Sequence, residues 1–169
     1  MDQTMLTGKS VIDSFDGEYD FLSNFYNCPV TYKGITYRNS EAAFQAQKVT
    51  DVYTQVRLFT DVTASMAKKA GRNCDLRKDW DDIRVDAMRA IVLQKFLQNP
   101  RLEERLLATG NAVLIEGNWW NDRFWGVCKG EGCNMLGMIL MEVREYIRHL
   151  RGALGTAVAK SLEPLDYID

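Results

Sequence analysis

Apolar residues recur with the period of a helix in two long stretches of the chain. In the first stretch, Asp79 to Leu97, they fall on one helical face, at Ile83, Ala87, Met88, Ile91, Val92 and Phe96. The second stretch runs from Asn134 to His149, and its apolar face is formed by Leu136, Leu140, Val143, Ile147 and Leu150. Both patterns predict amphipathic helices that pack on a core.

Two other regions predict short strands. The β-prone runs Val30–Tyr32 and Ile35–Tyr37 flank Lys33-Gly34, where glycine supplies the positive φ of a two-residue hairpin turn. Ala112–Glu116 is predicted as a short buried strand. Residues 1–20 are expected to be irregular, with a short edge strand.

Glycine and proline mark the ends of two further predicted helices. Thr63–Ala70 is predicted as a short helix, with Gly71 as the residue that ends it. Asn99-Pro100 begins the other, which stops at Gly110. Residues 152–169 contain few large apolar side chains, so this tail is expected to be partly mobile.

A short polar helix is predicted directly after the hairpin. Asn39 or Ser40 is a suitable N-cap, and Glu41, Gln45 and Lys48 then lie at i, i+4 and i+7 on one face. A carboxylate, an amide and an amine in one row can bind a polar ligand. The alternative is a solvated face with a weak salt-bridge stripe.

Composition and charge narrow the class of protein. A chain of 169 residues with 46% hydrophobic content fits one globular domain with a substantial core. A net charge of −2 opposes binding of nucleic acid mainly through phosphates. No apolar run approaches the ~20 residues of a membrane span. The first residues lack a signal-peptide pattern, so a cytoplasmic location is expected.

Cysteine and histidine usage excludes several kinds of catalysis. Four cysteines occur without the spacing of a zinc site, so free thiols and no metal are expected. His149 is the single histidine, close to the end of a predicted helix. Nucleophilic catalysis by a Ser-His or Cys-His pair is therefore disfavoured, and acid–base work falls to carboxylates or lysine.

Two loops offer candidate binding surfaces. Asn118–Gly126 combines three tryptophans with polar side chains, and together with Trp80 it can form a stacking platform for a flat ring. The alternative is that these tryptophans cover a small core. Gly130–Asn134 precedes a predicted helix and can present N–H groups to an anion, although such loops are also common turns.

Seven segments, taken in order, resemble the YbiA-like family, also called the NADAR domain family. They are Phe21–Tyr26, Ser40–Lys48, Lys95-Phe96 with Asn99-Pro100, Leu106–Gly110, Asp122 with Trp125-Gly126, Gly132–Gly137, and Leu140–Arg144. The resemblance runs from about Phe15 to Leu150. It implies a single compact domain over 1–169, with an α+β, mainly helical fold and a few short strands.

The resemblance also implies an enzyme, an N-glycosidase that needs no cofactor. Some characterised members cleave ribosylaminopyrimidine intermediates of riboflavin biosynthesis, and others remove ADP-ribose from guanine bases. Both substrates are ribosyl phosphates joined to a flat base, which makes ADP-ribosylated nucleic-acid bases candidate partners. No membrane partner is expected, because the chain lacks a long apolar run. The choice between the substrates and the oligomeric state are not readable from the sequence.

Matching the family's motifs residue by residue assigns the site. Glu41, Lys48 and Asp122 match catalytic positions. The positions expected to bind substrate are Asn24, Trp80, Trp125, Gly126 and Asn134. Two departures are notable. Ala42-Ala43 stands where many members have His-Tyr, which removes that histidine as a catalyst, and Cys128 replaces a frequent glycine.

The expected chemistry follows from these residue types. Glu41 would stabilise an oxocarbenium-like transition state, and Asp122 would orient or deprotonate water. Tryptophans would stack on the base, and the N–H groups at the helix start near Asn134 would hold a phosphate. Lys48 either attacks the anomeric carbon to form a Schiff base or stays protonated as an electrostatic partner. The alternative to an enzyme is a non-catalytic module that binds ADP-ribose or a related nucleotide.

Overall fold

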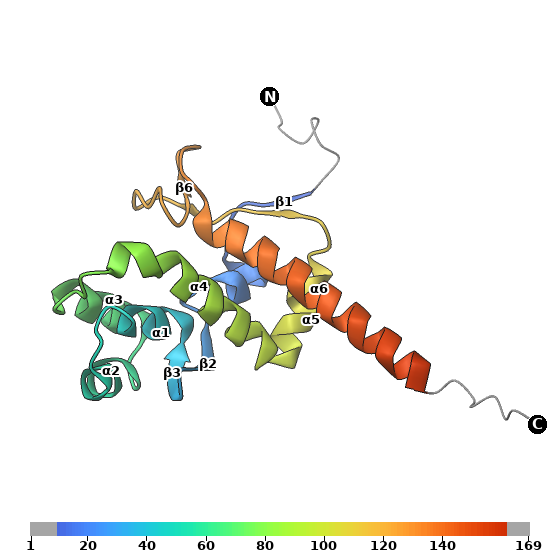
Figure 1. Ribbon diagram of the computed structural model, residues 1–169. Coiled ribbons are helices and arrows are strands. Elements are labelled where there is room, and N and C mark those ends of the chain that lie inside the picture. Colours follow the sequence, from blue (N-terminus) through green and yellow to red (C-terminus); the bar gives the residue numbers. More distant parts are fainter. Residues whose placement is uncertain (1–9, 162–169) are drawn as a thin grey trace, which may run out of the picture.

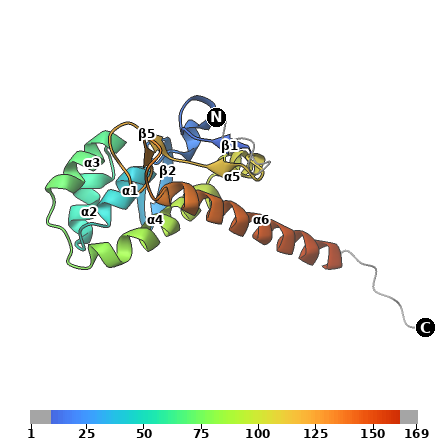
Figure 2. The same cartoon turned by 90° about the horizontal axis from the view of Figure 1, so that it is seen from above.

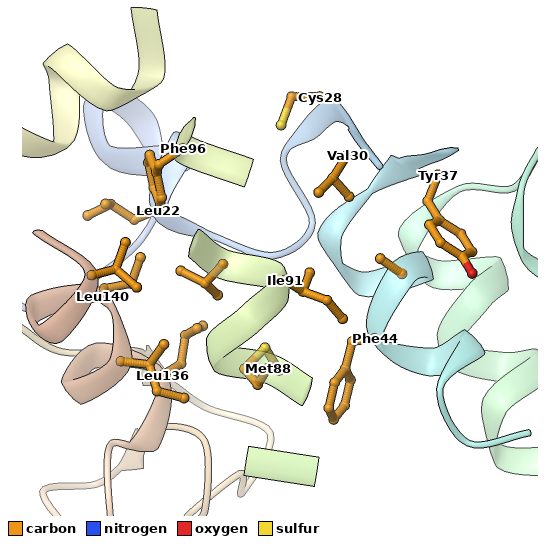
Figure 3. Packing of buried hydrophobic residues seen from close by; sticks show 14 of the residues in the cluster. Leu22, Cys28, Val30, Tyr37, Phe44, Met88, Ile91, Phe96, Leu136 and Leu140 are labelled. Atoms are coloured by element: carbon orange, nitrogen blue, oxygen red, sulfur yellow. The ribbon is translucent and has the colours of Figure 1, made fainter. Parts of the chain in front are cut away.

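Helix α4 (Trp80–Leu97) lies at the centre of the molecule, between α1 (Ser40–Ala46) and α6 (Met135–Ser161), as Figure 3 shows. The computed structural model describes residues 10–161, with side chains as far as Val158. The other helices are η2 (Gly17–Leu22), α2 (Val52–Phe59), α3 (Ala64–Asn73) and α5 (Pro100–Ala108). The predicted α+β, mainly helical fold is confirmed.

The core is built around the apolar face of α4. Its Met88 and Ile91 pack between Leu136 and Leu140 of α6 and Phe44 of α1, all of them buried (Figure 3). Each such side chain contributes roughly 1.5–3 kcal/mol by leaving water. The two strongest helical patterns in the sequence therefore meet in one core, as predicted.

Within the described residues the strands pair two by two. β2 (Asn27–Tyr32) and β3 (Ile35–Asn39) form the predicted antiparallel hairpin, and both residues of its turn have positive φ, Lys33 at 50° and Gly34 at 80°. β1 (Val11–Ile12) pairs in parallel with β4 (Val113–Leu114). β5 (Gly117–Asn118) pairs in parallel with β6 (Val127–Cys128).

The shorter helices agree only in part with the sequence. α5 begins at Pro100 as predicted, and Gly110 beyond its end has a φ of +59°. α3 has Thr63 as its N-cap, but the helix continues through Gly71 to Asn73. The prediction that Gly71 ends this helix is therefore wrong. α2, which the sequence pattern did not predict, begins after the capping side chain of Asp51.

Helix α6 is longer than predicted. Instead of ending near His149 it continues to Ser161, and its C-terminal part extends beyond the rest of the molecule in both views (Figures 1 and 2). Residues 151–158 are all exposed. The expected mobile tail is helical over 152–161, and 162–169 lie outside the described residues. Among the helices of the described region, none has the length and apolarity to cross a membrane.

Candidate active site

A cavity of about 520 Å³ opens between helices α1, α3 and α4 and the segment 116–125. The turn 23–25 and the start of α6 complete its wall. This volume lies in the usual range for small-molecule sites, roughly 300–1,000 Å³. The cavity brings together Asn24, Glu41, Lys48, Trp80, Asp122 and Trp125, six of the residues that the sequence predicted for the site.

The polar face of α1 points into this cavity. Glu41, Gln45 and Lys48 all line it, while every residue of the helix is buried. Asn39 is the N-cap, because its Oδ1 accepts a hydrogen bond of 2.8 Å from the N–H of Ala42. The alternative of a solvated salt-bridge stripe is therefore wrong. Whether this face is buried depends on the elements that pack around α1, and helical spacing alone could not predict that packing.

Glu41 is a buried carboxyl with a single side-chain donor. Its exposed fraction is 7%, and Nε2 of Gln45 donates to its Oε1 at 2.8 Å. Burial raises the pKa of Glu41, whereas the Gln45 hydrogen bond and the positive charges of Lys68 and Lys48 act to lower it. A negative charge on Glu41 is thus poorly solvated and available to a cationic centre in the cavity.

Lys48 lies just beyond α1 and is held between two neighbours. Its Nζ donates to the carbonyl oxygen of Gly71 at 3.2 Å and lies 5.7 Å from the ring centroid of Trp80. Burial lowers the pKa of Lys48, while Cys74 and Glu41 act to raise it. The carbonyl and the ring both favour the ammonium form, and the burial favours the free amine.

Asp122 organises the loop in which it stands. Its Oδ1 accepts hydrogen bonds from the N–H groups of Phe124, at 3.1 Å, and Trp125, at 2.9 Å. Nδ2 of Asn118 donates a hydrogen bond of 2.7 Å to the main-chain oxygen of Asp122, and Oδ1 of Asn118 accepts one of 3.0 Å from the N–H of Asp122. The carboxylate therefore fixes the aromatic loop and lines the cavity at the same time.

The tryptophans belong both to the core and to the cavity wall. The ring of Phe44 lies 5.1 Å from Trp80 and 5.3 Å from Trp125, the latter in an edge-to-face arrangement. Trp80 is buried at 7% exposure and still lines the cavity. Trp120 also lines it, whereas Trp119 is 86% exposed. Trp80 and Trp125 pack on the core, so the core-cover interpretation is right in part, and because both also line the cavity their stacking on a ligand stays a prediction.

Asn24 is attached directly to the first turn of α1. Its main-chain oxygen accepts a hydrogen bond of 3.0 Å from the N–H of Glu41. The side chain is buried at 7% exposure, and its Oδ1 is without a hydrogen-bond partner among the described residues. Asn24 therefore supplies an unpaired polar atom beside Glu41, where a ligand can bind it.

Gly126 and Asn134 lie behind the cavity wall and do not line it. The N–H groups at the start of α6, which were expected to hold a phosphate, already have hydrogen-bond acceptors within the protein. The N–H groups of Asn134, Met135 and Leu136 already donate to main-chain oxygens of the loop 124–126. These donors hold the aromatic loop against the helix, so they are not available to an anion.

Sequence reasoning missed three charged residues of the cavity. Glu116 follows β4, and Lys68 and Arg84 come from α3 and α4. Burial raises the pKa of Glu116 to about 7, and the negative charges of Asp122 and Glu41 add to the effect. Its position at the end of a predicted buried strand was the available signal. Lys68 and Arg84 lie in polar stretches of the sequence, where no local pattern marks them as part of a cavity.

The remaining chemical groups of the sequence analysis lie elsewhere. All four cysteines are within the described residues and are free thiols. His149 is exposed on α6, where its ring bonds the main-chain oxygen of Glu145. The described part of the chain contains no group of three or more His, Cys, Asp or Glu side chains arranged to hold a metal ion.

The helical α+β fold, with acidic groups and a lysine in an aromatic-walled cavity, has the character of an enzyme. The NADAR domain matches residues 13–148 of the chain. The chain belongs to the NADAR domain family, as its motifs indicated.

Relatives support this assignment over most of the chain. The riboflavin biosynthesis protein VVA0006 of Vibrio vulnificus is 44% identical over 136 residues, which cover 79% of this chain and 37% of that protein. N-glycosidase YbiA of Shigella boydii is 37% identical over 137 residues, covering 79% of this chain and 85% of that protein. The NMR structure of the Escherichia coli protein YbiA matches with a TM-score of 0.73 at 32% identity, over 95% of this chain and 92% of that one. The expectation of an enzyme of glycosidase type is confirmed.

Proposed function

We propose that this protein hydrolyses the N-glycosidic bond between C1′ of a phosphorylated ribose and a nitrogen of a flat base. One observation supports this above others: Glu41 and Asp122 line the same cavity as the aromatic wall of Trp80 and Trp125. Carboxylates beside a stacking surface suit a reaction in which the sugar becomes cationic while the base departs. The N-glycosidase relatives point to the same reaction class.

Glu41 is the group that stabilises the sugar cation. Breaking the C1′–N bond leaves positive charge on C1′ and the ring oxygen, and a buried carboxylate attracts that charge more strongly than an exposed one. Gln45 holds Glu41 by its Oε1, so the carboxylate does not need to reorient during the reaction. Asp122, fixed through its Oδ1, orients the water that attacks C1′.

The phosphate of the substrate is bound by the cationic side of the cavity. Lys68 from α3 and Arg84 from α4 line it, together with Lys48. These side chains take over the anion-binding role that the sequence analysis gave to the start of α6. Arg84 is positioned by the ring of Phe124, with 4.0 Å between its guanidinium carbon and the ring centroid.

The leading substrate is a ribosylaminopyrimidine phosphate of riboflavin biosynthesis. A relative named for riboflavin biosynthesis is 44% identical to this chain, and the net charge of −2 does not favour a long nucleic-acid duplex. ADP-ribosylated guanine is the second substrate to test, because a single flipped or unpaired base needs few phosphate contacts.

Parallel assays test the proposal. The purified protein is incubated with the ribosylaminopyrimidine phosphate and, separately, with oligonucleotides carrying ADP-ribosylated guanine, and the released base is quantified. We expect release from the first substrate, and a loss of about 10²-fold or more in kcat for Glu41→Gln. Glu104→Gln, an exposed glutamate on α5, is the matched control and should be fully active.

Three results would contradict parts of the proposal. Near-normal kinetics of a folded Glu41→Gln variant would remove the catalytic role of that residue. Turnover of the oligonucleotides alone would replace the leading substrate. Tight binding of ADP-ribose in calorimetry, with no product from either substrate at high enzyme concentration, would identify a non-catalytic binding module instead.

A further inference from the structure

Glu116 is held by residues that do not themselves reach the cavity. Its main-chain N–H donates to Oδ1 of Asn134 at 2.9 Å, and its main-chain oxygen accepts from the N–H of Val127 at 2.8 Å. Nδ2 of Asn134 donates in turn to the oxygen of Leu114 at 2.9 Å. The side-chain amide of Asn134 thus ties the end of β4 and the main chain of Glu116, two residues beyond it, to the start of α6.

Gly126 allows the Glu116 side chain to take this position. A Cβ atom on Gly126 would lie 2.3 Å from the main-chain oxygen of Glu116 and 3.0 Å from its Cγ. Any larger residue would therefore push Glu116 away. Gly126 and Asn134, the two predicted site residues outside the cavity lining, both act on this one glutamate.

Glu116 lines the cavity, and the environment of its carboxyl disfavours a charge. Its Oε2 is buried and has no hydrogen-bond partner within the part of the chain that the structure describes. Four charged groups from different elements act on it: Asp122 from the aromatic loop, Glu41 from α1, Lys68 from α3 and Lys95 from α4. The two carboxylates outweigh the two lysines, and together with burial they raise the pKa of Glu116 to about 7.

We propose that Glu116 is the general acid that protonates the departing base. This role rests on the proposed N-glycosidase function. As the C1′–N bond breaks, its electron pair stays on the nitrogen, and the proton of Glu116 moves to that nitrogen. Water then adds to C1′, and its surplus proton returns to the Glu116 carboxylate. The sum is substrate plus water giving free sugar phosphate and free base, with the enzyme unchanged.

The three acidic groups of the cavity then have separate tasks. Glu41 carries negative charge against the sugar cation, Asp122 orients water, and Glu116 supplies a proton. Enzymes that use two carboxyl groups commonly separate their tasks by giving them different environments. Here Glu41 has a hydrogen-bond donor in Gln45, whereas Oε2 of Glu116 has none among residues 10–161, and a carboxyl oxygen without a donor retains its proton more readily.

A pair of substrates with different leaving groups tests this role. An aminopyrimidine must gain a proton to leave, whereas pyridine leaves from a ribosyl pyridinium 5-phosphate as a neutral molecule without one. For Glu116→Gln we expect kcat to fall by about 10²-fold or more on the ribosylaminopyrimidine phosphate and by less than about 10-fold on the pyridinium. Glu41→Gln should lose activity on both, because both reactions pass through the sugar cation.

The pH profile of the unmodified enzyme gives an independent readout. With the aminopyrimidine substrate, kcat/KM should fall as pH rises through about 7, where Glu116 loses its proton. With the pyridinium substrate this basic limb should be absent. An equal loss on both substrates in folded Glu116→Gln, or the same basic limb with both, would overturn the general-acid role alone. A wild-type enzyme that cleaves neither of these substrates, nor the oligonucleotides carrying ADP-ribosylated guanine, would overturn the proposed function and this role with it.

Discussion

At the scale of single residues, the site is a set of charges placed where water cannot solvate them. Glu41 is 7% exposed, and Lys48 is only partly exposed between Gly71 and Trp80. Burial acts in opposite directions on the two, since it raises the pKa of Glu41 and lowers that of Lys48. Each shift favours the neutral form, and the neighbours oppose it. Gln45 donates a hydrogen bond to Glu41, and the Gly71 oxygen and the Trp80 ring stabilise the ammonium of Lys48.

The role of Lys48 can be decided by trapping. Its contacts with the Gly71 oxygen and the Trp80 ring both stabilise the ammonium, so we expect an electrostatic partner and direct attack by water. Lys48→Arg should then keep activity within about 10-fold, while Lys48→Met should lose about 10²-fold, because it removes the charge. Borohydride added during turnover should give no adduct in mass spectrometry. A ribosylated Lys48 would establish the Schiff-base route instead.

Single residues also show how far the sequence reaches. Glu41, Gln45 and Lys48 could be predicted as one face because helical spacing is a local property. Whether that face is buried depends on how α3 and α4 pack against α1, and local sequence patterns do not predict this packing. Glu116 was missed for the same reason, since its burial and the charges around it come from elements distant in sequence, such as Glu41 on α1 and Lys68 on α3. Six of the eight predicted site residues line the cavity, and the other two position a third carboxyl.

At the scale of elements, the packing of α3 against α1 positions two site residues at once. The contact is made at Gly71, where a Cβ atom would lie 1.9 Å from Oε1 of Gln45. The same glycine offers its carbonyl oxygen to Lys48 at 3.2 Å. Gly71 therefore allows α3 and α1 to pack closely. The prediction took it as a helix end because glycine is common at that position.

Substitution of Gly71 should damage the site more than the fold. In Gly71→Ala the new methyl group displaces the Gln45 amide, and Glu41 loses its donor. We expect kcat to fall by about 10-fold or more and stability to fall by about 1–3 kcal/mol from overpacking. Circular dichroism melts and steady-state kinetics measure the two effects.

Gly152→Ala is the control, because it lies in exposed α6 and meets nothing within 4 Å. It should leave kcat unchanged and stabilise the helix by about 0.5–1 kcal/mol, as alanine usually does in place of a helical glycine. Normal kcat for Gly71→Ala would mean that Gln45 does not need its observed position. A similar stabilisation of both variants would mean that α3 and α1 are not in close contact at Gly71.

At the scale of the whole molecule, the core and the cavity share the same elements. α4 contributes Met88 to both, and Phe44 of α1 packs on the core while it holds Trp80 and Trp125 in place. The general fold could be predicted because α4 and α6 show strong helical periodicity. The length of α6 was not predicted, because residues 151–158 are all exposed and lie outside the core that would demand a helix, although Leu154 and Val158 continue the helical spacing of Ile147 and Leu150.

Gathering Glu41, Glu116 and Asp122 in one cavity has a consequence for the stability of the whole protein. The pKa of Glu116 is raised to about 7 in the folded state, from an ordinary value of 4.5. Between these values the folded protein binds more protons than the unfolded chain. The contribution of Glu116 to the free energy of unfolding therefore decreases as pH rises through this window, with the loss complete above about pH 7.

Glu116→Gln should remove this loss. A shift of this size corresponds to at most on the order of 3 kcal/mol, and less where water reaches the group. We expect the variant to melt several degrees above the wild type at pH 8 and close to it at pH 4.5, in calorimetric scans across that range. Glu104→Gln, on the exposed face of α5, should follow the wild type at every pH. A Glu116→Gln variant less stable than the wild type at pH 8 would show that the carboxylate is well solvated. The expected result would instead mean that the cavity disfavours the charged form of Glu116, as the proposed general-acid role requires.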